Sequence, residues 1–297
     1  MRETIYYQRG MPDPIYDENF VLDIVRKHVP GAKSLKSIDE DGGEGRVYVV
    51  DNDIVLKVQR PQQLRSSTGL EKEAFFLNQV EKQTDVHSPR VLGYGKEGTL
   101  EYLVMTRIHG IKVEYTKLTL NEKNALLAEL GKELRKIHTM DQTPFRSSGL
   151  FPCDDPPDLK ERIKRRYLSA MLKRKEIIGQ KKIDEASAFM DKELANIADT
   201  DTDSFAALHV NPYICHIFVD EKTHQYSGLI DYGDSYIGHP VFDMWYWSVI
   251  SRRKLLKSYT LEKPVSPAFR VIFDTVNVIS QKISEILQDC IGTGKIN

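Results

Sequence analysis

The chain has 297 residues, and its 42 Lys and Arg residues nearly balance its 43 Asp and Glu residues. Hydrophobic residues make up 40% of the sequence and charged residues 29%, so the chain can bury a sizeable core and is not disordered throughout. Nucleic-acid-binding proteins usually carry a surplus of basic residues, which is missing here. The sequence also has no stretch of about 18 apolar residues, so no membrane-spanning segment is expected.

The length is typical of about two domains or lobes. The three cysteines, Cys153, Cys215 and Cys290, are far apart and form no CxxC pair, so neither a zinc site nor a disulfide framework is expected. The N-terminal segment is polar and has no apolar signal core. These features predict a protein of the reducing cytoplasm.

The first part of the chain, residues 1–107, predicts a small sheet with two helices. Apolar residues at helical spacing predict helices over residues 17–29 and 70–82. Short runs rich in Val, Ile and Leu predict strands at residues 33–38, 46–50, 54–58, 90–92 and 102–107. The second and third of these form a hairpin that turns at Asn52.

The second part, residues 108–297, is expected to be mainly helical. One long helix over residues 118–140 carries a single apolar stripe of Leu126, Leu130, Leu134 and Ile137. A segment rich in Pro, Asp and Ser predicts a loop over residues 144–157. Beyond it we expect two helices within 158–198 that part near Gly179, short apolar runs at 206–208 and 217–219, and helix over the last 50 residues.

Two segments of the second part carry the most informative chemistry. They read L-H-V-N-P-Y-I-C-H-I-F-V-D over 208–220 and G-L-I-D-Y-G-D-S-Y-I-G-H-P-V-F-D over 228–243. Asp231, at the end of an apolar strand, can offer oxygen ligands to Mg²⁺, and His216 is a candidate second ligand although nitrogen suits this ion poorly. Taken alone, I-D-Y-G-D also fits a hairpin turn after a buried strand.

Lys57 lies within the apolar strand V-L-K-V of the first part. A lysine in a buried strand requires an anionic partner, and the helix over 70–82 offers Glu73 or Glu71. The alternative is an exposed strand lysine beside a solvated helix glutamate.

Gly42, Gly43 and Gly45 lie between the first two strands, where glycines let backbone N–H groups approach phosphates. The run lacks the GxGxxG spacing, and a flexible hairpin turn explains it equally well. Its acidic neighbours Asp39, Glu40, Asp41 and Glu44 would repel phosphates.

Together these segments resemble the aminoglycoside phosphotransferase and choline kinase-like family, over about residues 18–250. The family pattern is H-x-D-x-x-x-x-N/H, followed by I-D-F/Y-G-D and a further Asp. His209, His216, Asp231, Asp234 and Asp243 match this pattern. The departure is Asn211, which stands where the family has its catalytic Asp.

The resemblance implies an α+β, two-lobed protein-kinase-like fold with a small antiparallel-sheet N-lobe over 1–107 and a mainly helical C-lobe over 108–297. It implies Mg²⁺ and ATP or GTP, with γ-phosphoryl transfer to a hydroxyl of a small molecule. In the nucleotide site, Lys57 and Glu73 would orient the phosphates beneath the loop of Gly43 and Gly45. Backbone groups from Thr106 to Ile108, in Y-L-V-M-T-R-I-H-G (102–110), would meet the purine edge.

In the catalytic loop, the resemblance implies that Asp231 and His216 hold metal, that His209 braces the loop through Asp243, and that Asn211 faces the acceptor hydroxyl. The helix segment L-G-K-E-L-R-K-I-H (130–138) also resembles the family, and we interpret His138 as a capping or core histidine and not as a catalyst. A neutral amide cannot accept the hydroxyl proton. Positioning and charge stabilisation can nevertheless retain part of the rate, because the transition state of phosphoryl transfer is loose.

Three interpretations of Asn211 follow. The chain is a slow kinase, a nucleotide-binding pseudokinase or regulatory module, or a kinase with an engineered substitution. The unusual neighbours Val210, Pro212, Tyr213 and Cys215 favour natural divergence over engineering.

The sequence does not identify the molecule that accepts the phosphoryl group. Residues 160–182 carry ten Lys or Arg and two Glu. Polycationic aminoglycosides would instead bind best in an acidic cleft. Asp199, Asp201 and Asp203 could supply one, but both runs also fit solvated surfaces. The sequence therefore does not decide between an aminoglycoside, another antibiotic, a sugar and an amino alcohol, between ATP and GTP, or between oligomeric states.

Overall fold

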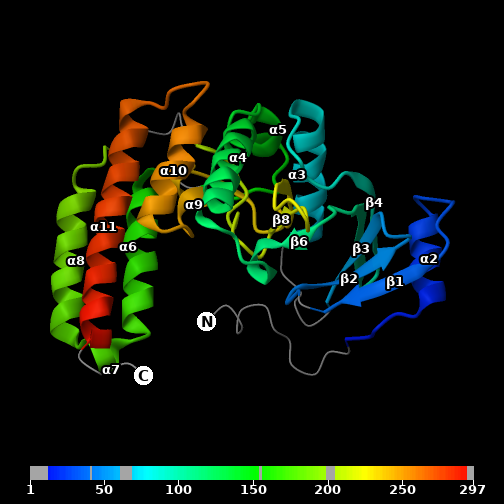
Figure 1. Cartoon of the computed structure of the whole chain (residues 1–297), viewed down its shortest axis with the longest axis horizontal. Coiled ribbons are helices and arrows are strands. Elements are labelled where there is room, and N and C mark those ends of the chain that lie inside the picture. Colours follow the sequence, from blue (N-terminus) through cyan, green and yellow to red (C-terminus); the bar gives the residue numbers. More distant parts are fainter. Residues whose placement is uncertain (1–12, 41, 61–68, 154–155, 199–204, 293–297) are drawn as a thin grey trace.

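The structure is a computed structural model that describes residues 13–40, 42–60, 69–153, 156–198 and 205–292. Figure 1 shows a small lobe built on a sheet, a central region around helix α4, and a layer of long helices at the far end. The expected two-lobed α+β architecture, with an antiparallel sheet followed by a mainly helical portion, is confirmed. The acidic run Asp199, Asp201 and Asp203 lies outside the described residues.

The small lobe is a five-stranded antiparallel sheet in the order β1-β2-β3-β5-β4. Its strands are β1 (Leu35–Asp39), β2 (Gly45–Val50), β3 (Ile54–Gln59), β4 (Val91–Glu97) and β5 (Leu100–Thr106). Helices α2 (Glu18–Arg26) and α3 (Gly69–Gln83) belong to two different core clusters, one on each side of the sheet.

The period of two along β3 decides which residues face which helix. Leu56 and Val58 join the core cluster that contains α2, while Val55 joins the cluster that contains α3. Lys57 has the same parity as Val55, so its side chain lies on the α3 side of the sheet. The hairpin before β3 turns at Asp51 and Asn52, both at positive φ (51° and 71°), as the sequence predicted.

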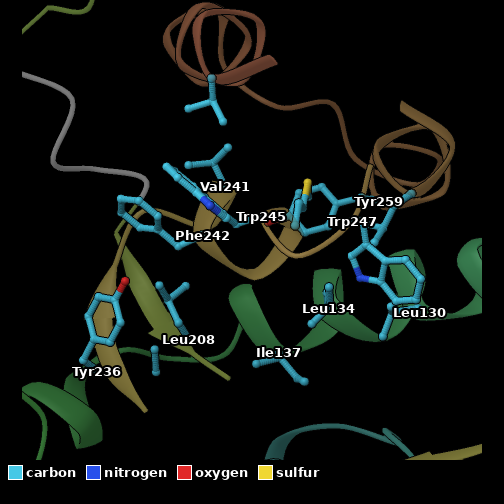
Figure 2. Packing of buried hydrophobic residues seen from close by; sticks show 14 of the residues in the cluster. Leu130, Leu134, Ile137, Leu208, Tyr236, Val241, Phe242, Trp245, Trp247 and Tyr259 are labelled. Atoms are coloured by element: carbon cyan, nitrogen blue, oxygen red, sulfur yellow. The ribbon is translucent and has the colours of Figure 1, made fainter. Parts of the chain in front are cut away.

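The large lobe is organised around α4 (Leu120–His138). The helix begins with a capping box between Thr119 and Glu122, and its predicted apolar stripe is buried. Figure 2 shows Leu130, Leu134 and Ile137 of this stripe among the aromatic side chains of the following segments. Helix α10 (Val249–Tyr259) crosses α4 at Gly131, where a Cβ atom would lie 2.5 Å from the Leu255 carbonyl oxygen. Gly131 is therefore required for this close approach.

Helices α6 (Pro156–Leu172), α8 (Gln180–Leu194) and α11 (Pro267–Gly292) form the outer layer, with the short α7 (Lys175–Ile178) at one end (Figure 1). Gly179, at φ 83°, separates α7 from α8 where the sequence predicted a break. The predicted loop over 144–157 is wrong in part, because α5 (Thr143–Ser147) and the first turn of α6 occupy both ends of it. Proline is tolerated in a first helical turn, where its missing N–H has no partner to lose.

Short strands and helices of the large lobe hold the two loops that carry Asn211 and Asp231. Strand β7 (Ala206–Leu208) pairs with β10 (Tyr236–Gly238), and β6 (Ile111–Lys112), β8 (Ile217–Val219) and β9 (Tyr226–Leu229) form a second small sheet. The remaining helices here are η2 (Val113–Tyr115) and α9 (Val241–Met244). Within the described ranges, none of the helices combines the length and apolar character needed to cross a bilayer.

We expect Leu134→Ala to lower the free energy of unfolding by about 2–5 kcal/mol, because Leu134 is fully buried in the α4 stripe and its loss leaves a cavity. The matched control is Leu120→Ala in the same helix, since Leu120 is 70% exposed and should change stability by less than about 0.5 kcal/mol. Urea unfolding followed by circular dichroism measures both, and equal effects would contradict the packing described here.

Candidate active site

Lys57 joins three parts of the chain. Its Nζ lies 2.7 Å from Glu73 Oε2 on α3 and 2.8 Å from Asp231 Oδ1 in the loop after β9. Glu73 is almost fully buried, whereas Glu71 is exposed, so the partner on α3 is Glu73. The lysine thereby connects the small sheet, helix α3 and the large lobe through two ion pairs.

Lys57 and Asp231 hold each other in the ionised form against burial, whereas burial shifts Glu73 toward its neutral form. Burial alone would lower the pKa of Lys57, but Asp231 and Glu73 raise it above its usual value. Burial likewise opposes the Asp231 carboxylate, but Lys57 and His216 hold its pKa well below its usual range. Burial raises the pKa of Glu73, and the charge of Lys57 only partly offsets this effect. Removing the ammonium would therefore leave two destabilised carboxylates.

Asp231 occupies a strained backbone position. Its φ is 70°, in the left-handed region that non-glycine residues rarely adopt. The preceding residue, Ile230, is fixed on both sides, because its amide donates to the His216 carbonyl and its carbonyl accepts from His209 Nε2 at 2.8 Å. These bonds hold the Asp231 carboxylate toward Lys57 and His216.

His216 lies between Asp231 and Asn211. Its Nε2 is 3.1 Å from Asp231 Oδ2, and its Nδ1 is 2.9 Å from the Asn211 carbonyl oxygen. Burial disfavours its charge, but contacts with Cys215, Asp231 and the Asn211 carbonyl prevail and raise its pKa to about 9. In this arrangement the protonated ring donates from both nitrogens.

Asp243 anchors the loop that carries Asn211. This fully buried carboxylate accepts hydrogen bonds from the backbone amides of His209, at 2.8 Å, and Val210, and from His138 Nε2 at 2.9 Å. Burial lowers the pKa of His209 to about 4, so its ring is neutral at pH 7. Its Nε2–H donates to the Ile230 carbonyl, which leaves Nδ1 to accept from the Asn211 amide at 3.3 Å.

The backbone of Val210 shows why the loop needs the Asp243 anchor. Val210 has a φ of 81°, an unusual value for a β-branched residue that costs about 1–3 kcal/mol. The bond from its amide to Asp243 holds it there. The side-chain amide of Asn211 makes no hydrogen bond to any residue that the structure describes, so both of its ends are available to a substrate.

Gly45, at the end of the glycine run, lies against the side chain of Lys57. A Cβ atom at Gly45 would come within 3.2 Å of the Lys57 side chain, and one at Gly42 would lie 2.5 Å from the Gly45 carbonyl, whereas Gly43 faces open space. The acidic neighbour Glu40 is paired with Arg46 and Arg60 at 2.7 and 2.8 Å. This pairing reduces the repulsion of phosphates that the sequence suggested.

The segment between the lobes exposes one backbone donor. The Thr106 amide donates to the Arg90 carbonyl at 2.9 Å, and the Arg107 amide donates to the Asp53 carbonyl at 2.8 Å. The Ile108 amide has no acceptor among residues inside the described ranges. It can therefore donate to a planar ligand edge.

Sequence reasoning missed the role of His138. Besides Asp243, this buried histidine contacts the Tyr259 hydroxyl at 3.0 Å, so it links α4 and α10 to the loop anchor. Its place directly after the apolar stripe of α4 indicated a core residue, and its polar partners come from much later in the chain. Trp247 was also missed, and its Nε1 donates to the Pro212 carbonyl at 3.0 Å.

Asp231 fits a role in holding Mg²⁺. In the described part of the chain, no three His, Cys, Asp or Glu side chains are placed to enclose a metal ion. Mg²⁺ usually keeps several waters and binds one or two protein carboxylates together with substrate phosphates, so a cluster of three protein ligands is not required. His216 could join it only after losing the proton that it shares with Asp231.

Comparison with known proteins agrees with this geometry. Residues 36–262 match the profile of the phosphotransferase enzyme family. No protein of the curated set is similar enough in sequence to count as a match.

Several solved structures share the fold. A macrolide 2′-phosphotransferase from Brachybacterium faecium is 18% identical with a TM-score of 0.61, over 93% of each chain. The GDP complex of aminoglycoside 2′-phosphotransferase-IIIa is 15% identical with a TM-score of 0.61, over 94% of this chain and 99% of that one. The streptomycin and ATP complex of APH(2″)-IIa is 19% identical with a TM-score of 0.57, over 94% and 96%.

The pKa shifts predict a stability maximum near pH 6.5 for the metal-free protein. Above it, the folded state keeps the His216 proton that the unfolded chain releases, so the free energy of unfolding should fall by about 3 kcal/mol by pH 9. Below pH 6.5, His209 and His239 bind protons in the unfolded chain but stay neutral in the folded protein, because burial lowers their pKa values. The free energy of unfolding therefore also falls as the pH drops toward about 4.

Urea unfolding in the presence of a chelator, from about pH 5 to about pH 9.5, measures this profile. The control is His216→Asn, which should flatten the alkaline side and leave the acid side unchanged. An alkaline decline of the same size in both proteins would contradict the raised pKa of His216.

Proposed function

The chain belongs to the phosphotransferase enzyme family, and from this premise we propose that it transfers the γ-phosphoryl group of ATP or GTP to a hydroxyl of a small molecule. The main observation behind this proposal is the Lys57 ammonium held between Glu73 and Asp231, on a side chain that packs against Gly45. Nucleotide complexes of the similar folds, with ATP in one and GDP in another, support the donor.

In this proposal the nucleotide lies between the lobes. Lys57 binds the phosphates and stays fixed by Glu73, the loop of Gly43 and Gly45 covers them, and the Ile108 amide and the Thr106 carbonyl meet the base. We place the lobe boundary in the same segment, after Arg107. Mg²⁺, held by Asp231 with His216 as a second candidate, would neutralise charge on the phosphates.

The reaction makes one bond and breaks one. The acceptor oxygen bonds to the γ-phosphorus, the bond from that phosphorus to the β–γ bridging oxygen breaks, and the nucleoside diphosphate leaves with the bridging oxygen. The hydroxyl proton passes to water, because the Asn211 amide has no basicity. Asn211 positions the hydroxyl by hydrogen bonding, and Asp243 with His209 keeps Asn211 in place.

The second candidate is a nucleotide-binding pseudokinase or regulatory module. It is favoured by Asn211 at the position of the family's catalytic Asp. This loop is nevertheless as firmly anchored as a working catalytic loop requires, through Asp243, His209 and His138. We therefore favour a slow enzyme over a module without activity.

Replacing the phosphate-binding lysine tests the nucleotide site. We expect Lys57→Met to weaken binding of Mg·ATP and Mg·GTP by about 10-fold or more and to leave adenosine and guanosine binding nearly unchanged, because in this proposal the ammonium contacts the phosphates and not the nucleoside. Calorimetry measures all four ligands, and unchanged nucleoside binding also shows that the site is folded. The control is Lys96→Met, a half-exposed lysine of the same sheet. An equal loss for nucleosides and triphosphates would make Lys57 purely structural.

Restoring an acid at position 211 tests catalysis. General-base catalysis contributes about 10²–10⁴-fold, so Asn211→Asp should raise kcat and kcat/KM together within that range, with little change in nucleotide affinity. Asn211→Ala is the companion variant, and it should lower kcat because it cannot position the hydroxyl. Turnover is measured on the best acceptor of a hydroxylated panel, and no gain with Asp for any acceptor would favour the binding module.

A further inference from the structure

A strip of aromatic side chains leads away from Asn211 along the large lobe. The Tyr213 amide donates to the Asn211 carbonyl at 2.8 Å, which places Tyr213 at the edge of the catalytic loop. The Tyr213 ring contacts the Tyr246 ring, with centroids 5.8 Å apart, and the Trp247 ring at 5.3 Å. Tyr213 and Tyr246 are partly exposed, so the strip is accessible from solvent.

Arg166 of α6 ends this strip. Its guanidinium carbon lies 4.8 Å from the ring centroid of Trp245 and 4.6 Å from that of Tyr246. Stacking occupies the faces of a guanidinium, while its N–H donors lie in the plane and stay available. Arg166 is exposed, and no carboxylate of the described residues pairs with it. The side chain is thus held in place without being neutralised.

A second uncompensated cation lies behind the strip. Arg252 is 4% exposed and donates to the Trp245 carbonyl and to Asn277 Oδ1, both neutral acceptors. Its Nε makes no hydrogen bond. Burial lowers the pKa of Arg252, and the nearby Arg166 charge adds a smaller effect in the same direction, while the interaction with the Tyr167 hydroxyl opposes it. The large lobe therefore carries excess positive charge beside the aromatic strip.

Resting on the proposed function, we infer that this strip binds the acceptor and that the acceptor is an anionic hydroxylated molecule whose carboxylate or phosphate group pairs with Arg166. The planar fork of arginine matches both kinds of oxyanion. An anion would relieve the repulsion between the two arginines, whereas a polycation such as an aminoglycoside would add to it. The aromatic rings would contact the carbon skeleton and direct the hydroxyl toward Asn211.

The experiment compares hydroxylated probes of different charge by calorimetry, without nucleotide. D-gluconate carries a carboxylate, D-glucose 6-phosphate a phosphate, D-glucose no charge, and kanamycin several positive charges. We expect one or both anionic probes to bind at least about 10-fold tighter than glucose, with a preference that weakens as ionic strength rises. Arg166→Gln should abolish the preference, and Arg166→Lys should retain part of it. The matched control is Arg165→Gln, an exposed neighbour on the same helix without aromatic contacts.

Three results would overturn the inference. They are tighter binding of kanamycin than of either anion, unchanged anion affinity in Arg166→Gln, and no measurable preference of the wild type for either anionic probe. Failure of the proposed function would appear separately, as the absence of Mg·ATP and Mg·GTP binding or of phosphoryl transfer by the wild type, because the probe titrations contain no nucleotide.

Discussion

A buried ammonium between two carboxylates is the constraint on which the rest of this structure depends. Lys57 cannot remain charged on the inner side of the sheet unless Glu73 and Asp231 both approach it. The two ion pairs of Lys57 fix the rotation of α3 against the sheet and the position of the loop after β9. They also bring the small lobe against the large one at the place where we propose that phosphates bind. Stability and the proposed phosphate recognition are therefore requirements on the same three side chains.

The second organising element is the carboxylate of Asp243, which works through hydrogen bonds to backbone amides. It holds Val210 in a left-handed conformation that its side chain disfavours, and it receives His138 from α4. The strain is local and lies next to Asn211, where a tightly specified geometry matters most. The neutral amide at 211 is thus presented by a rigid loop, so its weakness as a base is a property of its chemistry and not of its position.

Sequence reasoning predicted the lobes, most of the elements and the residues around Lys57, because alternation in β3 and the spacing of the two loop motifs are local signals. The residues alone offered both Glu73 and Glu71, and the family resemblance favoured Glu73. The packing of Leu70, Phe76 and Leu77 against the core seats α3 so that Glu73 faces Lys57. The ten basic residues over 160–182 looked equivalent in sequence. Only tertiary placement separates Arg166, stacked on Trp245 and Tyr246, from its solvated neighbour Arg165. The helix α5 was missed because the Pro-, Asp- and Ser-rich composition of residues 144–157 indicated a loop, whereas Pro144 lies in the first turn of this helix, where proline is tolerated.

The pair between Lys57 and Asp231 spans 174 residues of the chain. During synthesis, Lys57 and Glu73 leave the ribosome together and can pair within a folded sheet and helix, but their third partner follows only after most of the large lobe has been made. A nascent chain can therefore form the pair between Lys57 and Glu73 but not the complete group of three charges. Under the proposed function, nucleotide binding would stabilise only the nearly finished protein, so it would act on the last stage of folding and not on the first.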